Sequence, residues 1–231
     1  QRGAEEQQRI HGGALLHLLG QHVLLVGIAE QAIQSHSQNG HIILIHLIGL
    51  VHEGELLDTW AAAGVEEVNQ EFHARFSAEA KRYDYLISLK DQEPNVFHWR
   101  YAYQATWHLD IEKMKECSRL FIGRHDFTSF CANSLETDPD QTRTIYRIDF
   151  KEEGNIVRIS FYGEGFLRYM VRMLTGTMLE VGRGRITLED VQKIMDRRDK
   201  TACRYNAKPH GLSLVKVYYD AEEVRKLTEK N

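Results

Sequence analysis

The chain has 231 residues, of which 42% are hydrophobic and 27% charged, as in a soluble globular protein with a sizeable core. Its formal net charge of -4 argues against an overall basic nucleic-acid binder, although a basic face is compatible with that charge. The three cysteines, Cys117, Cys131 and Cys203, fit neither a disulfide framework nor a paired-cysteine zinc site, which favours a reducing, cytoplasmic location.

The first 63 residues differ from the rest in composition. They hold seven of the twelve histidines, and with two arginines against six acidic residues they carry the whole net negative charge. Their longest apolar run, which begins at Ile42 and is interrupted by His46, is too short to span a membrane. Neighbouring histidines such as His17 and His22 are five positions apart, a spacing that shares a face on neither a helix nor a strand. We therefore expect no metal site here, and a poorly packed segment without a sustained helical or strand period.

From Val65 onward the pattern becomes regular. Residues 75–89 alternate as a half-buried strand does. Asp110 opens a predicted helix with an apolar stripe, which Gly123 closes. Residues 144–150 and 156–162 predict two strands that are joined by a hairpin turn.

The last third continues the alternation of element types. Residues 165–181 predict an apolar helix that ends at Gly182 and Gly184, and residues 187–190 form a capping box for a short helix. Residues 212–219 predict a final strand. Strands mixed with helices, including a hairpin, indicate an α+β domain on a mixed, largely antiparallel sheet flanked by helices.

Four motifs follow one another in this region. They read FHARFSA from Phe72 with KRYDY from Lys81, GRHDFTSF from Gly123, GFLRYMVR from Gly165, and PHGL from Pro209. Any one of them could arise by chance. In this order, across about 155 residues, they resemble the tRNA pseudouridine synthase A family.

The resemblance implies a pseudouridine synthase fold with a central RNA-binding cleft, a homodimer, and a cytoplasmic isomerase with no membrane association. Its expected reaction converts uridine to pseudouridine in the anticodon arm of tRNA, with no cofactor and no metal. The target base must leave the stem to be reached. A flat aromatic side chain can hold the detached uracil by stacking, and an attacking carboxylate needs a cation to stay ionised.

The resemblance also implies roles for single residues. Arg172 matches the arginine that pairs with the catalytic aspartate, and its setting in an apolar helix argues against a plain surface arginine. Tyr83 matches the substrate-binding tyrosine; the competing interpretation is a core tyrosine, which would suit Tyr85 better.

Other residues are expected to complete the site. Phe166 and Leu167 wall the substrate pocket, with a plain core role as the alternative. Arg168, Arg183 and Arg185 are candidates for RNA phosphate contacts, the alternative being that exposed helix ends simply carry arginine.

The sequence departs from the family at its start. The stretch Gly-Arg-Thr-Asp-Ala-Gly-Val-His, which should carry the catalytic aspartate before Phe72, is not found, and Asp58 is the only aspartate before Asp84. We therefore expect an unmatched segment at 1–64, a pseudouridine synthase domain at 65–220 and a charged tail at 221–231. Because the catalytic aspartate motif is missing, the alternative function is an inactive RNA-binding or dimerising remnant of the family, which would bind tRNA without measurable turnover.

Overall fold

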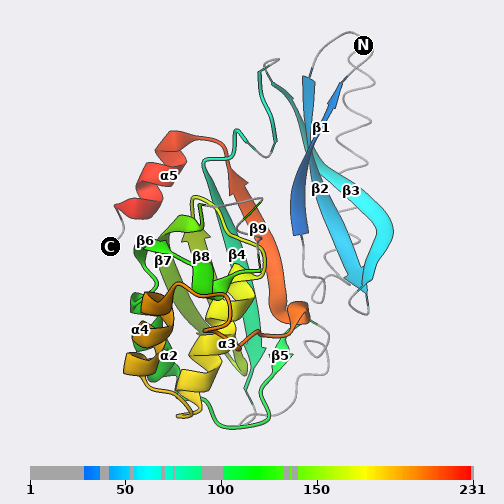
Figure 1. Ribbon diagram of the computed structural model, residues 1–231. Helices are drawn as coiled ribbons and strands as arrows, with labels where there is room; N and C mark the ends of the chain where they lie inside the picture. The colour runs from blue at the N-terminus through cyan, green and yellow to red at the C-terminus, as the bar shows by residue number, and fades with distance from the viewer. Residues whose placement is uncertain are drawn as a thin grey trace, which may run out of the picture.

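The computed structural model describes residues 29–36, 42–52, 55–68, 71–74, 76–89, 101–132, 136 and 140–229, and for residues 29–67 the backbone alone. Figure 1 shows two sheets. The first is a three-stranded antiparallel sheet of β1 (Ala29–His36), β2 (Ile42–His52) and β3 (Glu55–Val68). The histidine side chains of the first 63 residues lie outside the described part of the chain. The expectation that they form no metal site is therefore not tested.

The second sheet has six strands, one of which, β4, pairs with three of the others. Its members are β4 (Ala80–Ser88), β5 (Tyr103–Gln104), β6 (Gly123–Asp126), β7 (Thr142–Glu153), β8 (Ile156–Gly163) and β9 (Leu212–Tyr218). The order is β5-β4-β8-β7-β6, and β9 pairs with β4 on the edge away from β8. All these pairings are antiparallel except β4 with β5, so the structure confirms the predicted α+β fold on a mixed, largely antiparallel sheet.

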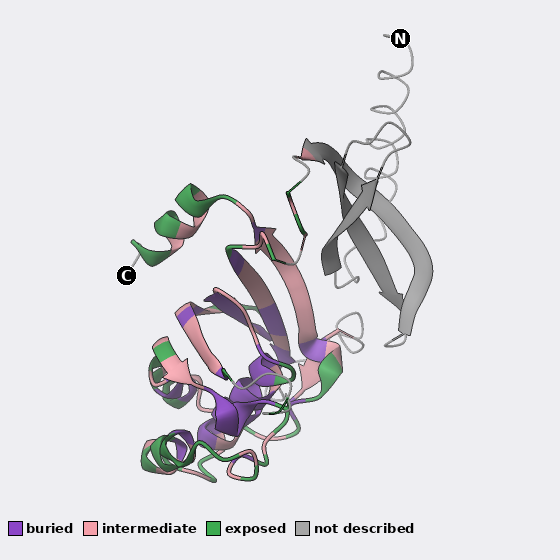
Figure 2. Cartoon of the chain, turned by 45° about the horizontal axis from the view of Figure 1, so that its top comes forward, coloured by how far each residue is buried: buried purple, intermediate pink, exposed green. Residues whose placement is uncertain are grey.

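Three helices cover one face of this sheet (Figure 1). They are α2 (Ile111–Arg119), α3 (Met170–Gly182) and α4 (Leu188–Arg197). Eleven of the thirteen residues of α3 are buried, which makes α3 the central helix of the layer. A fourth helix, α5 (Ala221–Thr228), contacts β7 and β9 and buries none of its residues, as the colours of Figure 2 show.

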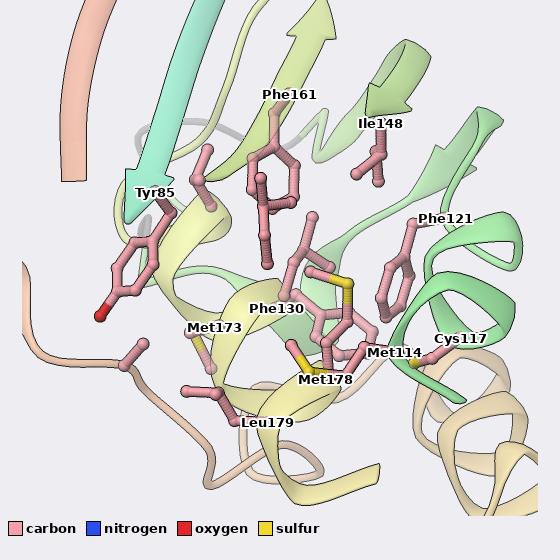
Figure 3. Packing of buried hydrophobic residues seen from close by; sticks show 14 of the residues in the cluster. Tyr85, Met114, Cys117, Phe121, Phe130, Ile148, Phe161, Met173, Met178 and Leu179 are labelled. Carbon is pink, nitrogen blue, oxygen red and sulfur yellow. The ribbon is translucent and has the colours of Figure 1, made fainter. Parts of the chain in front are cut away.

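The core lies between the covered face and α3 (Figure 3). Strand residues of one parity, such as Tyr85 and Phe161, belong to the same core cluster as methionines of α3 such as Met178, and all three are fully buried. This follows from the alternation of side chains along a strand and the apolar faces of a central helix.

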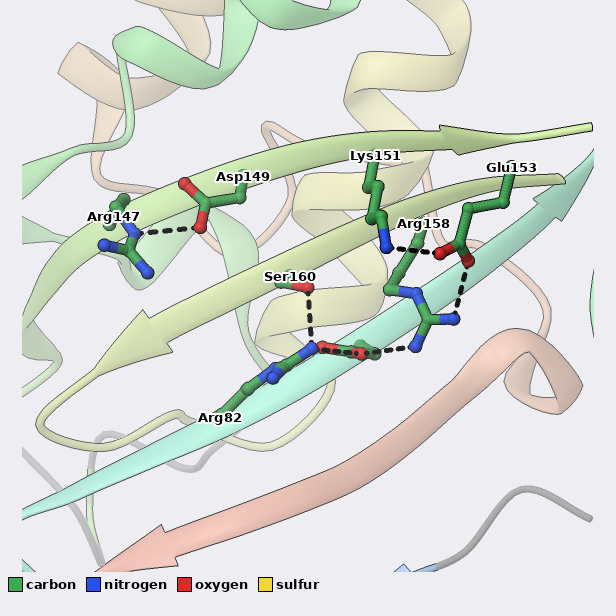
Figure 4. Close-up of polar contacts among 8 residues, drawn as sticks. Arg82, Arg147, Asp149, Lys151, Glu153, Arg158 and Ser160 are labelled. Carbon is green, nitrogen blue, oxygen red and sulfur yellow. Dashed lines mark hydrogen bonds and ion pairs between the residues drawn. The ribbon is translucent and has the colours of Figure 1, made fainter. Parts of the chain in front are cut away.

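The opposite face of the sheet carries ion pairs (Figure 4). Arg82 donates two hydrogen bonds to Asp84, both of 2.8 Å, and Arg158 lies 3.4 Å from the same carboxylate. Asp84 is buried although it lies on this face, and it points away from its neighbour Tyr83, as the strand alternation predicts.

Most element boundaries agree with the sequence pattern, with two corrections. The helix expected from residue 165 begins only at Met170, because Tyr169 has a left-handed backbone with φ of 65° that the helix cannot include. The helix expected to close at Gly123 ends at Arg119; Gly123, with φ of 108°, begins β6 instead.

Some elements were not predicted from the sequence. Strands β1, β2 and β3 occupy a segment for which no strand period was expected, and β3 crosses the proposed boundary at residue 64. The expected charged tail forms α5, whose first turn is capped by the Asp220 side chain. None of the helices in the described ranges is both long and apolar enough to cross a membrane.

Candidate functional site

Tyr83 lies in the middle of β4, opposite Phe161 of β8 and Leu214 of β9. Its ring meets the edge of the Phe166 ring, with 5.3 Å between centroids and planes at 80°. Burial raises the pKa of the Tyr83 hydroxyl, which therefore stays protonated at neutral pH. The half-buried tyrosine thus presents a neutral aromatic surface beside a second aromatic ring.

Phe166 reaches Tyr83 because of the glycine that ends β8. A Cβ atom on Gly163 would lie 2.7 Å from the Thr144 carbonyl oxygen and 3.1 Å from the Phe166 ring, so a larger residue would displace that ring. Leu167, the next residue, is only 5% exposed and belongs to the core. Of the two expected pocket walls, Phe166 contacts Tyr83 directly, whereas Leu167 packs inside.

Arg172 projects from the first turn of α3 and is fixed at one end. Its Nε donates a 2.7 Å hydrogen bond to the Ala207 carbonyl oxygen, and the Ala207 N–H donates back to the Arg172 carbonyl oxygen at 3.0 Å. Among the described residues, the two terminal amino groups of Arg172 have no hydrogen-bond partner. A guanidinium anchored through Nε keeps this fork for a carboxylate or another anion.

The segment that anchors Arg172, residues 205–208, is itself held on two sides. The Tyr85 hydroxyl donates a 2.7 Å hydrogen bond to the Lys208 carbonyl oxygen. On the other side, Gly176 of α3 lets this backbone approach closely, because a Cβ atom there would lie 2.9 Å from the Asn206 nitrogen. Tyr85 and Tyr83 lie on the same face of β4. One strand therefore carries Tyr83, the substrate-binding candidate, and also holds the segment that anchors Arg172.

These contacts bring the two principal candidates to the same side of the sheet. Tyr83 meets Phe166, which precedes α3, and Arg172 is tied to the segment that receives the Tyr85 hydroxyl. A surface depression of about 810 Å³ lies elsewhere, lined by open-face residues such as Arg82 and Arg147. A cavity shared by Tyr83 and Arg172 stays a prediction.

The three expected phosphate-binding arginines lie at both ends of α3. Arg168 precedes the helix, and its guanidinium carbon is 5.1 Å from the centre of the Tyr169 ring. Arg183 and Arg185 follow it, at the far end of a helix that is roughly 20 Å long at 1.5 Å per residue. The guanidinium carbon of Arg183 lies 3.4 Å from the centre of the Trp107 ring, and Arg183 and Arg185 both form ion pairs with Glu180. Arg168 is therefore the one that lies at the same end of α3 as Arg172.

Sequence reasoning missed several parts of this arrangement. Ala207 acts through its backbone, which leaves no signal in a side-chain pattern. Tyr85 was assigned to the core, where its ring does lie, but its hydroxyl also holds residue 208. Tyr169 appeared only as part of the motif that begins at Gly165, because a sequence does not reveal a positive φ at a non-glycine residue.

The described residues contain no group of three or more His, Cys, Asp or Glu side chains that could hold a metal ion. The geometry instead offers a neutral aromatic pair, Tyr83 and Phe166, and a fixed cation with a free fork, Arg172. Such a set can hold a flat ring and orient an anion.

Comparison with known proteins places these residues in a family context. A family model described as tRNA pseudouridine synthase matches residues 117–220. The chain is 41% identical over 165 residues to "tRNA pseudouridine synthase A" of Bacillus licheniformis, covering 71% of this chain and 66% of that protein. The protein of the same name from Bacillus subtilis strain 168 is 40% identical over the same coverage. That from Listeria monocytogenes serotype 4a strain HCC23 is 45% identical over 158 residues, 68% of this chain and 63% of that protein. The matched part thus spans less than two thirds of each relative's length, between 63% and 66%.

Proposed function

We propose that this chain, as a member of the tRNA pseudouridine synthase family, isomerises uridine to pseudouridine in the anticodon arm of tRNA. One observation carries the proposal. Tyr83, packed against Phe166, lies on the same side of the sheet as Arg172, whose guanidinium is fixed at Nε and free at its fork. The aromatic pair Tyr83 and Phe166 suits a detached uracil, and the Arg172 guanidinium suits a carboxylate.

The family resemblance implies the role of each residue, and this geometry is compatible with those roles. Tyr83 and Phe166 hold the flat uracil while its bond to the ribose is broken and remade, and stacking supplies about 1–3 kcal/mol. Arg172 keeps the attacking carboxylate ionised and oriented. In the family that carboxylate precedes the position of Phe72. The family stretch is not found here, so Asp58, the only aspartate before Asp84, is the first candidate to test.

The direct test is release of tritium from tRNA labelled at C5 of uridine, since that hydrogen leaves when the base is rejoined through carbon. We expect turnover by the chain, loss of several orders of magnitude with Arg172→Ala, and the same loss with Asp58→Ala if Asp58 supplies the carboxylate. Turnover that survives Asp58→Ala would assign the carboxylate to another residue. No turnover together with intact tRNA binding would identify the inactive RNA-binding remnant instead.

We extend the proposal to the surroundings of the protein. It binds tRNA as its partner, acts in the cytoplasm without a cofactor, and forms a homodimer as the family resemblance implies. Light scattering coupled to size-exclusion chromatography tests the last point: a mass near twice 26.8 kDa supports the homodimer, and a mass of 26.8 kDa rejects it.

A further inference from the structure

Tyr169 has a backbone conformation that its position does not favour. Of the described non-glycine residues, only Tyr169 and Arg198 have positive φ, of 65° and 48°. Arg198 ends α4, where a left-handed residue is a common terminator. Tyr169 instead begins α3, where Ser, Thr, Asp and Asn are preferred, and its side chain makes no capping hydrogen bond. Strain of this kind at a bulky residue is a reason to ask what the residue does.

The side chain of Tyr169 is also unusually exposed. It is 39% exposed, and among the residues whose side chains are described Phe76 is the other exposed large hydrophobic residue. Two guanidinium carbons lie near its ring centre, Arg168 at 5.1 Å and Arg172 at 4.9 Å. The ring therefore lies at the surface, between the cation of the candidate site and a second arginine.

The adjoining end of α3 adds positive potential. The first turn of α3 contains no acidic residue, and helix N-termini carry a partial positive charge that attracts phosphate. A surface aromatic ring, two guanidinium groups and this helix end together fit one ligand chemistry, a nucleotide with a flat base and an anionic phosphate.

We propose that Tyr169 stacks against the base of a nucleotide that neighbours the target uridine, and that Arg168 contacts the phosphate of that nucleotide. The inference rests on the proposed function, in which Tyr83 and Phe166 hold the target base itself. Tyr169 follows Phe166 by three residues and contacts Arg172, so its ring adjoins that site without belonging to the pair. Tyr169 then selects how the RNA strand runs past the target, which is a role separate from bond breaking.

A simpler account assigns the left-handed residue to the turn alone, which carries the chain from Phe166 into α3. Glycine adopts this conformation without strain, so Tyr169→Gly keeps the turn and removes the ring. The two accounts therefore differ for this variant: a turn residue is replaceable by glycine without loss of RNA affinity, whereas a stacking residue is not.

The experiment measures equilibrium binding of an unmodified tRNA transcript by filter retention at several salt concentrations. We expect Tyr169→Phe to bind like the wild type, and Tyr169→Leu and Tyr169→Gly to bind roughly 5- to 100-fold more weakly, the range for loss of one stacked base. Because stacking releases no counterions, these variants keep the wild-type salt dependence. Arg168→Gln should lower the slope of log affinity against log salt by about one phosphate contact.

Thermal melting of each variant separates binding from stability. Arg198→Gly is the control, because it removes the backbone strain at the second left-handed residue and leaves the Tyr169 ring in place. Its Tm shows the effect of strain relief alone. Tyr169→Gly should melt at or above the wild-type temperature while binding more weakly. Wild-type affinity in both Tyr169→Leu and Tyr169→Gly would overturn the inference and leave the proposed function standing. Failure of the wild-type chain to bind tRNA at low salt would overturn the proposed function, and this inference with it.

Discussion

At the scale of single residues, Arg172 owes its orientation to a backbone atom. Its Nε donates to the Ala207 carbonyl oxygen, and the segment that carries Ala207 is held by the Tyr85 hydroxyl through Lys208. Lysine cannot reproduce this arrangement, because an ammonium group has no separate Nε for the anchor and no planar fork for the anion. The residues that decide the arginine's geometry therefore include one, Tyr85, that need not touch substrate.

Tyr85→Phe should destabilise the fold by about 1–2 kcal/mol, because it leaves the Lys208 carbonyl oxygen without its 2.7 Å hydrogen bond while keeping the ring. Urea denaturation followed by circular dichroism measures this change. Tyr205→Phe is the matched control, since the Tyr205 hydroxyl has no hydrogen-bond partner among the described residues. Equal losses in the two variants would mean that the Tyr85 hydroxyl does not brace the segment.

At the scale of elements, the packing of α3 against residues 205–208 depends on one glycine. Gly176→Ala should cost about 1–3 kcal/mol despite the better helix propensity of alanine, because its Cβ would meet backbone atoms of Tyr205, Asn206 and Ala207 at 2.9–3.0 Å. Gly165→Ala is the control, since a Cβ atom there has no atom within 4 Å. Chemical denaturation of both variants tests the difference, and a neutral Gly176→Ala would show that the segment shifts freely.

The β7–β8 hairpin carries an acid-sensitive contact. Hydrogen bonds from Lys151 and Arg158 lower the pKa of Glu153 from 4.5 to about 2. A depressed carboxyl pKa stabilises the fold above pH 4.5, and that contribution disappears as the pH falls toward 2. Because the Glu153 side chain is 37% exposed, solvent screening limits the effect to less than about 1 kcal/mol.

Glu153→Gln should therefore lose stability relative to the wild type at pH 6 and match it near pH 2. Urea midpoints at the two pH values provide the measurement. Repeating them in about 1 M salt should shrink the difference at pH 6, because salt screens exposed charges. A difference that persists at pH 2 would assign the effect to packing of the side chain rather than to its charge.

The elements of this fold could be predicted from the sequence wherever local patterns determine them. The hairpin around Gly154, the Thr187–Asp190 capping box and the strand through Tyr83 all depend on neighbours in the chain, and all three were predicted. The late start of α3 and the anchoring of Arg172 were not, because they depend on a backbone angle at Tyr169 and on a carbonyl oxygen 35 residues away. The roles assigned to Tyr83 and Arg172 came from family resemblance and stay predictions, although the structure places both on the covered side of the sheet.

At the scale of the whole molecule, the two faces of the larger sheet are built differently. One face supports the helices, the core and the candidate site, and the other carries ion pairs (Figures 3 and 4). Among the residues whose side chains are described, the buried hydrophobic ones lie between Ala80 and Tyr218. The larger sheet thus has its own core.

A fragment of residues 65–231 should therefore fold by itself, with a single cooperative urea transition and the helical signal expected of α2 to α5. Introducing Gly176→Ala into the fragment should lower its midpoint as in the full chain, which would show that the same packing is present. A broad, non-cooperative transition would instead mean that β1, which contacts β9, is required for the sheet.

The position of β9 has a consequence for protein synthesis. Strand β9 is the last strand of the larger sheet in chain order, yet it pairs with β4, the first, and the segment that anchors Arg172 immediately precedes it. While a ribosome is still translating this region, β4 and β8 can pair, but one edge of β4 stays open and Arg172 has no support. Assembly of the larger sheet is consequently a late event in translation, and a chain that stalls before residue 212 would expose a strand edge able to pair with another nascent chain.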